Sequence, residues 1–289
     1  MDKAFKDYWD GAANWITLTS SDYYPDYLED ACEMYGSVLK IFKEILDVSE
    51  SSSALFRNIC KIRETWMRIQ LCRVFRKYVS PDTPVEMLKK KTQADQICRD
   101  FQHQFRPIQE TQRAFDGRPI PDEVICALLW EYKDRGKKGY DLTEKFFSMI
   151  RNDFERLEVI GPERAGQDIL LNKVFKKYPN PNRPVDFLLK EKKSGKILTV
   201  GLARYDGDRG GAQEDDRTGG YKNCAQEVIA FCNESGLDIK VVFLNDGPGL
   251  LLGSMWRDYS TIDEQYGESV KVMTLRMVPE RLTYEWLGI

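Results

Sequence analysis

Histidine is almost absent from this sequence, because only His103 among the 289 residues carries an imidazole. A site built from several histidines is therefore excluded, and a Ser-His or Cys-His nucleophile pair would have to use this one residue. His103 lies in the polar stretch QHQFRPIQ, which is typical of an exposed helical face. We therefore expect any chemistry to depend on carboxylates, lysine, arginine or a hard metal ion.

Paired cysteine motifs and long apolar runs are also missing. The seven cysteines are odd in number and scattered, with no CxxC, which disfavours both a disulfide framework and a zinc site. They are typical of buried thiols in a reducing cytosol. No run approaches the roughly 18 to 20 apolar residues of a membrane span, and no basic flank precedes an apolar N-terminal stretch. We expect a cytoplasmic protein.

Charge of one sign is in only slight excess, but it is unevenly distributed. The formal net charge is -3, from 43 basic and 46 acidic residues. Residues 1–50 hold eleven acidic side chains against four lysines, a net charge of -7, whereas residues 54–91 hold ten basic side chains against three acidic ones, a net charge of +7. The low total therefore conceals a basic segment.

The basic segment has apolar residues at three-to-four-residue spacing, which predicts an amphipathic helix that ends before Pro81. Such a helix could lie along a phosphate backbone through its cations Arg57, Lys61, Arg68 and Arg76. Alternatively, this basic face is solvated and pairs with the acidic first fifty residues.

The pattern of helix-like and strand-like segments predicts two structural regions. Helical patterning dominates from about 24 to 159, with breaks at 49–53, 81–84, 116–121 and near 136–139. After Gly161 we expect a helix at Glu163–Lys177 and another at Tyr221–Ser235, a further helical stretch at 250–265, and strands at 184–190, 197–205, 239–244 and 270–277. This order indicates an α/β fold, with a mainly helical DNA-binding or dimerisation region over 1–159 and a mixed central sheet flanked by helices over 160–289.

Asp186 is a carboxylate within the otherwise apolar strand PVDFLL, and an ionised Asp there needs a partner or a metal. The hairpin signal KKSGK brings a second strand, ILTVGLARY, back beside it. A glycine-rich polar loop follows, YDGDRGGAQEDDRTGGYKN.

This order of a strand Asp, a hairpin and a strand before a glycine-rich loop resembles the PD-(D/E)xK nucleases, and more closely their type II restriction endonucleases. The resemblance covers residues 160–278 and implies that Asp186 binds Mg²⁺. It also implies an acidic metal ligand on the next strand and a lysine two positions later that orients or activates the attacking water. Hard cations prefer such oxygen ligands.

The two remaining positions of the motif fall on Gly201 and Ala203, which cannot perform these roles. A glycine inside an apolar strand indicates either close backbone approach or replacement of a larger functional residue. We hypothesise that Gly201 replaces a glutamate in a disabled or nicking variant. Alternatively, the register differs, or the ligand role passes to Glu191, Asp206 or Asp208. Arg204 could supply a cation, although strand alternation places it on the opposite face from Gly201.

An acidic residue of the preceding helix often completes such a site in the family, and Glu163 and Asp168 are the candidates. Glu163 could equally be a first-turn residue that interacts with its own helix N-terminus.

The glycine-rich loop and its flanks offer side chains for reading base edges, because Arg and Gln can contact guanine and adenine, and Asp can accept from cytosine. The candidates for DNA contact are Arg204, Arg209, Gln213, Asp216, Arg217 and Lys222. Five acids and the absence of GxxxxGK[ST] and GxGxxG argue against a nucleotide-binding loop. A flexible solvated loop is the alternative.

Two functions follow from these observations. The resemblance implies a Mg²⁺-dependent, sequence-specific endonuclease of double-stranded DNA, or an impaired subunit of one, within a restriction-modification system. Its members usually act as two-fold dimers, and a heterodimer with a complete second nuclease subunit would suit an impaired site. The alternative is a non-catalytic DNA-binding or assembly protein on the same scaffold. A Rossmann-type enzyme is disfavoured because its phosphate fingerprint is missing.

Overall fold

The computed structural model describes residues 3–19, 22–83, 91–162, 168–207 and 213–289. The chain divides into two compact units: a helical unit, 21–135, and a sheet unit made of 1–20 and 136–289. Each unit has its own hydrophobic core. The division therefore lies at 135/136 and not at the expected 159/160, and residues 1–20 belong to the sheet unit. No helix in the described ranges is both long and apolar enough to cross a membrane.

The helical unit is built from short helices around aromatic and aliphatic side chains such as Phe42, Phe56 and Phe75. Its elements are α1 (Leu28–Asp47), α2 (Ser52–Cys60), α3 (Thr65–Tyr78), η3 (Lys91–Gln93), α5 (Ala94–Phe101), η4 (Gln102–Gln104), α6 (Ile108–Asp116) and the first part of α7 (Glu123–Asp153). His103 is exposed in η4, which confirms the expected exposure although not an α-helical face.

The basic segment forms two helices, so the prediction of one amphipathic helix is wrong. Glu64 ends the continuity because its carboxylate caps α3, accepting a bond from the Trp66 N–H at 2.8 Å. Arg68 is buried and donates to the carbonyl of Ile62 at 2.8 Å, which closes the break between the helices. One of the four cations expected on a phosphate-binding face is therefore used inside the unit.

Helix α7 runs without interruption through the glycines at 136 and 139, where we expected a break. Its first part contributes Leu129 and Trp130 to the core of the helical unit, and its last part contributes Phe146 and Ile150 to the core of the sheet unit. Burial at both ends offsets the roughly 1 kcal/mol that each interior glycine costs a helix.

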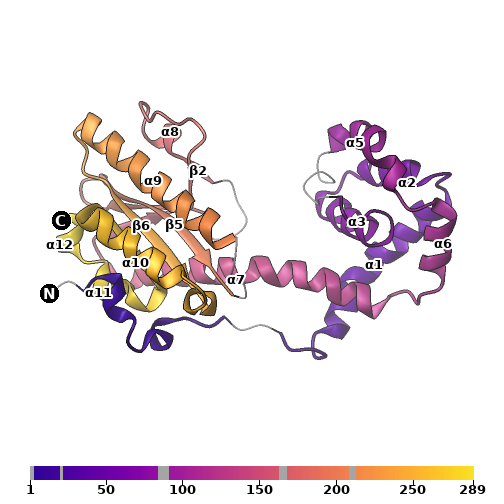
Figure 1. Ribbon diagram of the computed structural model, residues 1–289, viewed down its shortest axis with the longest axis horizontal. Coiled ribbons are helices and arrows are strands. Elements are labelled where there is room, and N and C mark those ends of the chain that lie inside the picture. The colour runs from indigo at the N-terminus through magenta and orange to yellow at the C-terminus, as the bar shows by residue number, and fades with distance from the viewer. Residues whose placement is uncertain (1–2, 20–21, 84–90, 163–167, 208–212) are drawn as a thin grey trace. The chain divides into compact units, whose positions relative to one another are not determined.

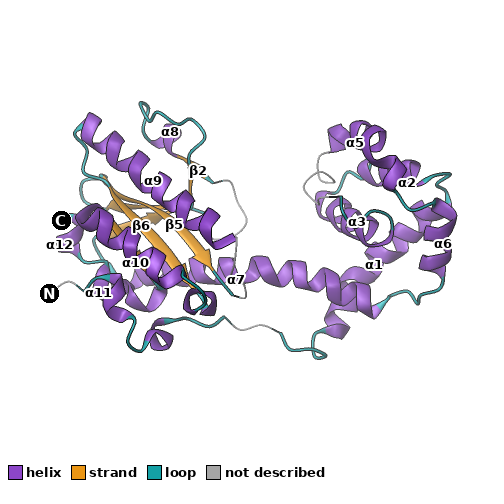
Figure 2. Cartoon of the chain, in the orientation of Figure 1, coloured by secondary structure: helices purple, strands orange, loops and turns teal. Residues whose placement is uncertain are grey.

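The sheet unit has a mixed five-stranded sheet in the order β1-β4-β5-β6-β7. Its strands are drawn in orange in Figure 2. Strands β1, β4 and β5 are antiparallel, whereas β5, β6 and β7 are parallel. The strands are β1 (Leu157–Ile160), β4 (Phe187–Glu191), β5 (Ile197–Tyr205), β6 (Lys240–Asp246) and β7 (Val270–Met273), and a separate ribbon pairs β2 (Ile169–Leu170) with β3 (Pro184–Val185). The expected α/β class and mixed sheet are confirmed.

Helices cover both faces of this sheet. Tyr221 of α9 (Gln213–Ser235) stacks on Phe243 of β6 with ring centroids 4.2 Å apart, and α10 (Met255–Tyr266) packs beside α9 (Figure 1). On the opposite face, Phe146 of α7 contacts Phe187 of β4 at 4.8 Å. The shorter elements are η1 (Phe5–Tyr8), η2 (Ala12–Trp15), α8 (Leu171–Val174), η5 (Pro248–Leu251), η6 (Gly267–Ser269), η7 (Leu275–Met277), α11 (Val278–Arg281) and α12 (Tyr284–Leu287).

Several local predictions for this unit need correction. In place of a helix over Glu163–Lys177, the described part of that range holds β2 and the single turn α8. An apolar run as short as Ile169–Leu171 is compatible with either a strand or a helix. Pairing with β3 stabilises the strand conformation at Ile169 and Leu170. Strand β1 lies in the stretch expected to be helical, and β7 ends at Met273 because the next residues turn into η7.

Candidate functional site

Asp186 occupies the bend between β3 and β4, where the chain leaves one ribbon and enters the main sheet. Its N–H donates to the Gly201 carbonyl at 2.9 Å, and its Oδ2 accepts from the Ala203 N–H at 2.7 Å. The Asp186 carboxylate thus takes the place of a backbone carbonyl as the acceptor for the Ala203 N–H, at the point where β4 no longer runs beside β5. This bond fixes the carboxylate at the carboxyl end of β5, the edge where open α/β sheets bind ligands.

Asp168 is brought next to Asp186 by the β2–β3 ribbon. Ile169 pairs with Val185 in antiparallel register, so Asp168 and Asp186, the residues directly beyond this pair, lie near each other. Burial raises the pKa of the Asp186 carboxyl, and the negative charge of Asp168 adds to this increase, while the Ala203 N–H and Arg204 oppose it. Two carboxylates are therefore held close enough to repel each other. The other acidic candidate, Glu163, lies outside the described residues.

Gly201 and Ala203 present no functional group at the positions where the resemblance implies an acid and a lysine. An ideal Cβ on Gly201 would lie 2.0 Å from Cζ of Phe187, because the two residues are paired and the Phe187 ring covers the glycine. Gly201 therefore has a packing reason for lacking a side chain. Ala203 contributes only its backbone N–H, to Asp186.

Arg204 and Asp206 follow at the end of β5. The Arg204 side chain is exposed, and its Nε lies 3.8 Å from Oδ1 of the buried Asp206. The Asp206 backbone is held by the turn after β6, since its N–H donates to the Asp246 carbonyl at 2.7 Å and its carbonyl accepts from the Gly249 N–H at 2.8 Å. Gly249 is required there because an ideal Cβ would lie 2.8 Å from that carbonyl oxygen.

Tyr221 and Asn245 complete this edge; in the sequence, the stretch 245–249 is more typical of a turn than of a site. Asn245 pairs with Arg204 in the parallel register and is fully buried. Its Oδ1 accepts from the Tyr221 hydroxyl at 2.7 Å, and burial raises the pKa of that tyrosine well above its ordinary value. The polar NDGPG stretch after an apolar strand is the local signal that could have indicated Asn245.

The other proposed ligands and base-reading residues are placed differently. Glu191 lies at the far end of β4, roughly 16 Å from Asp186 for five extended residues, and accepts from the Ser194 hydroxyl at 2.5 Å. It does not join Asp186. Lys222 is half-buried on α9 next to Tyr221. Asp208 and Arg209 lie outside the described residues, and of Gln213, Asp216 and Arg217 only the backbone, in the first turns of α9, is described.

Of the cations expected to contact a phosphate backbone, the other three also bond within the helical unit. Arg57 donates to Asp95 at 2.7 Å, Lys61 to Asn58 at 3.0 Å, and Arg76 to the Pro81 carbonyl at 2.9 Å. Arg57 therefore pairs with a residue outside the acidic first fifty. All three side chains keep some exposure, so contact with DNA by this unit stays a prediction.

The described residues contain no group of three or more acidic, cysteine or histidine side chains able to hold a metal ion. Asp168 and Asp186 nevertheless suit one hard cation, because a divalent ion between them would remove their mutual repulsion and meet its preference for carboxylate oxygen. Comparisons with family models, with curated proteins and with solved structures found no match to this chain.

Proposed function

We propose that this chain is a Mg²⁺-dependent endonuclease of double-stranded DNA, or a subunit of one, of the type II restriction class. The observation that carries this proposal is the closeness of Asp168 to Asp186, which the β2–β3 ribbon brings together beside the carboxyl end of β5, where the charge of Arg204 also acts on Asp186. The antiparallel β4–β5 hairpin beside Asp186 supports the proposal, because the resemblance rests on a strand Asp, a hairpin and a strand before a glycine-rich loop.

In this proposal each residue has a distinct task. Asp168 and Asp186 hold the cation, and the Ala203 N–H keeps the Asp186 carboxylate in place. Arg204, which is exposed at the strand end, binds the phosphate to be cleaved. A Mg²⁺ ion bound at the pair would polarise a phosphodiester oxygen and lower the pKa of a bound water.

Plasmid cleavage tests the proposal. The purified chain is incubated with supercoiled DNA and Mg²⁺ or Mn²⁺, and intact, nicked and linear products are separated. Discrete linear fragments indicate a complete enzyme, and open circles indicate a nicking one. We expect Asp186→Asn and Asp168→Asn to lose this activity by at least a hundredfold, since they remove ligands. Glu191→Gln is the matched control, because Glu191 lies on the same strand but at its far end, and it should keep full activity.

Metal binding provides a readout that does not require cleavage. Calorimetric titration with Mn²⁺ should show one binding event in the unaltered chain and in Glu191→Gln. Asp186→Asn should weaken this binding by tenfold or more. Equal affinity in all three proteins would show that the aspartate pair does not hold the metal.

A non-catalytic DNA-binding or assembly protein is the second candidate, and the Phe187 ring over Gly201 favours it because that ring fills the place of a further ligand. Both candidates predict DNA binding that weakens as salt increases. Only the first predicts cleavage. Unchanged plasmid together with salt-dependent binding would therefore support the second, and would direct attention to a partner subunit that completes the site.

A further inference from the structure

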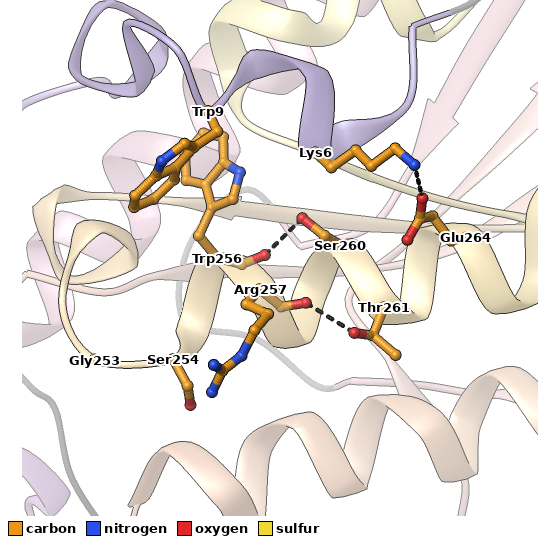
Figure 3. Close-up of a pocket in the computed structure, with 9 residues that line it drawn as sticks. All are labelled: Lys6, Trp9, Gly253, Ser254, Trp256, Arg257, Ser260, Thr261 and Glu264. Carbon is orange, nitrogen blue, oxygen red and sulfur yellow. Dashed lines mark hydrogen bonds and ion pairs between the residues drawn. The ribbon is translucent and has the colours of Figure 1, made fainter.

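A cavity of about 540 Å³ lies between the N-terminal segment and α10 with the two residues that precede this helix (Figure 3). It is lined by Lys6, Trp9, Gly253, Ser254, Trp256, Arg257, Ser260, Thr261 and Glu264. Its volume falls within the roughly 300 to 1,000 Å³ of small-molecule sites. The cavity is separate from the aspartate pair, since none of its lining residues belongs to β4 or β5.

Aromatic side chains form one wall of this cavity. Trp9 is 55% exposed, which is unusual for the largest apolar side chain, whereas Trp256 is only 4% exposed. Their rings lie edge to face with centroids 5.8 Å apart (Figure 3). Phe5 stacks on Trp256 with ring centroids 4.4 Å apart and holds it in place. The exposed Trp9 ring therefore offers a supported surface on which a planar ring can stack.

Positive charge and polar groups form the other walls. Lys6 pairs with Glu264, while Arg257 is exposed and makes no ion pair or side-chain hydrogen bond within the described part of the chain. The lining side chains therefore carry one excess positive charge, although Asp258 lies behind Ser254 and accepts from its hydroxyl at 2.6 Å. The indole Nε1 of Trp256 is buried with no partner among the described residues. Gly253 and Ser254 lie at the N-terminus of α10, where backbone N–H groups favour an anion.

Two hydroxyl groups give the cavity acceptors for a donor group of a ligand. Ser260 donates to the carbonyl of Trp256 at 2.8 Å, and Thr261 donates to the carbonyl of Arg257 at 3.0 Å (Figure 3). Because each hydroxyl hydrogen is already used in the helix, the oxygen lone pairs are left to accept. A ligand that suits all of these walls has a flat ring with N–H donors and a negatively charged group.

We infer that this cavity binds a nucleotide, with the base stacked on Trp9 and the phosphate beside Arg257 and the start of α10. The nucleotide can be free, or it can be an unstacked nucleotide of a single strand, because both present the same base and phosphate. Binding here requires neither the aspartate pair nor cleavage.

Calorimetry on the full chain tests this inference with each deoxynucleoside 5′-monophosphate. Deoxyribose 5-phosphate, which lacks the base, and the deoxynucleosides, which lack the phosphate, serve as reference ligands. We expect at least one nucleotide to bind roughly tenfold or more tightly than either reference, given the usual contribution of stacking. Trp9→Leu and Arg257→Gln should each weaken that nucleotide by a similar factor. A short single-stranded oligonucleotide, titrated in parallel, distinguishes the two sources.

Matched controls separate the cavity from the rest of the surface. Trp66→Leu removes a 41%-exposed tryptophan of the helical unit, and Arg63→Gln removes an exposed arginine of that unit; neither should change the affinity. Asp186→Asn should also bind the nucleotide normally, so a failure of the endonuclease proposal would not affect this result. Absence of saturable binding by any nucleotide or oligonucleotide, reference ligands that bind equally well, or affinities unchanged in Trp9→Leu and Arg257→Gln would each overturn the inference.

Discussion

The ring of Phe187 lies where a side chain at Gly201 would begin, with Cζ 2.0 Å from an ideal Cβ. The two residues face each other across the β4–β5 hairpin, and Phe146 closes over the ring from α7. Glycine therefore permits an aromatic ring to pack flat against the middle of the sheet, at the position where the resemblance implies a metal ligand.

This contact predicts strong coupling between the two positions. Gly201→Ala should destabilise the sheet unit by about 1 to 3 kcal/mol because the ring must move. Phe187→Ala alone should cost about 3 to 5 kcal/mol. In urea unfolding, the double variant should be less destabilised than the sum of the two single variants, since the added methyl group would enter the space that the ring leaves.

The same contact determines how a restored acidic ligand can be tested. Gly201→Glu alone should destabilise the sheet, because its side chain meets the Phe187 ring. If this variant gains no cleavage, the cause could be the disturbed sheet or the lack of a role for the new carboxylate. Combining Gly201→Glu with Phe187→Ala removes the clash. If the two single variants and the double variant are additive in stability, the ring does not exclude a side chain at position 201.

Asp186 should make stability depend on pH in the direction of its raised pKa. A carboxyl whose pKa is higher in the folded protein than its ordinary value of 3.8 destabilises the fold once it is ionised. This destabilisation grows as the pH rises from the ordinary pKa through the raised pKa of the folded protein. Asp186→Asn should therefore be more stable than the unaltered chain at pH 7. The advantage should disappear towards and below the ordinary value, where the aspartic acid is neutral in both states.

Thermal melting at a series of pH values measures this difference. Because Asn can still accept from the Ala203 N–H, the hydrogen bond itself is retained. Mg²⁺ should raise the melting temperature of the unaltered chain but not that of Asp186→Asn. A stability difference that stays constant between pH 4 and pH 8 would contradict the proposed cause.

Gly139 offers a test of the continuity of α7. Nothing lies within 4 Å of an ideal Cβ at this position, and the glycine has no positive φ. Gly139→Ala should therefore stabilise the protein by about 0.4 to 1 kcal/mol, as expected for an open site in a helix. A loss of stability, measured in urea, would indicate that the helix breaks there.

The Arg183–Glu227 pair should hold the turn before β3 onto α9. The Arg183 Nη2 lies 2.5 Å and its Nε 3.1 Å from Oε2 of Glu227, and both side chains are only about one-fifth exposed. Arg183→Met should cost about 1.5 to 3 kcal/mol, and a double-mutant cycle with Glu227→Gln should show a clear coupling energy.

The exposed cross-strand pair Lys190–Glu158, at 2.9 Å, is the matched control and should show a coupling below about 1 kcal/mol. Equal coupling energies in the two pairs would mean that the partial burial of Arg183 and Glu227 does not strengthen their contact. Because this turn leads directly into β3, loss of the pair should also weaken Mn²⁺ binding at Asp186.

Sequence patterns predicted the parts of the fold that rest on local signals. The hairpin was indicated by Lys192–Lys196 between two apolar runs, and Gly195 adopts the positive φ of 73° that such a turn needs. The position of Asp186 beside β5 followed from the same hairpin. The closeness of Asp168 and Asp186 could not be predicted in this way, because it depends on two strands of two residues each that are separated by α8 and a turn.

The continuity of α7 could not be predicted from local signals either. The low helix propensity of glycine is visible in the sequence, whereas the burial of side chains at the two ends of the helix is not. The packing of the Phe187 ring over Gly201 could not be predicted, because the sequence shows only a glycine within an apolar strand. Tyr221 and Asn245 were missed because their hydrogen bond joins a helix to a strand 24 residues later in the chain.

The N-terminal segment and the helical unit can fold at different stages of synthesis. Residues 21–135 are contiguous, so the helical unit can fold as soon as they have emerged. Phe5, in contrast, stacks on Trp256, its N–H donates to Asp263, and the Thr17 N–H donates to Asp246. The segment from Phe5 to Thr17 can therefore pack only after residues 246–263 have been made, and the cavity beside Trp9 exists only once synthesis has passed α10.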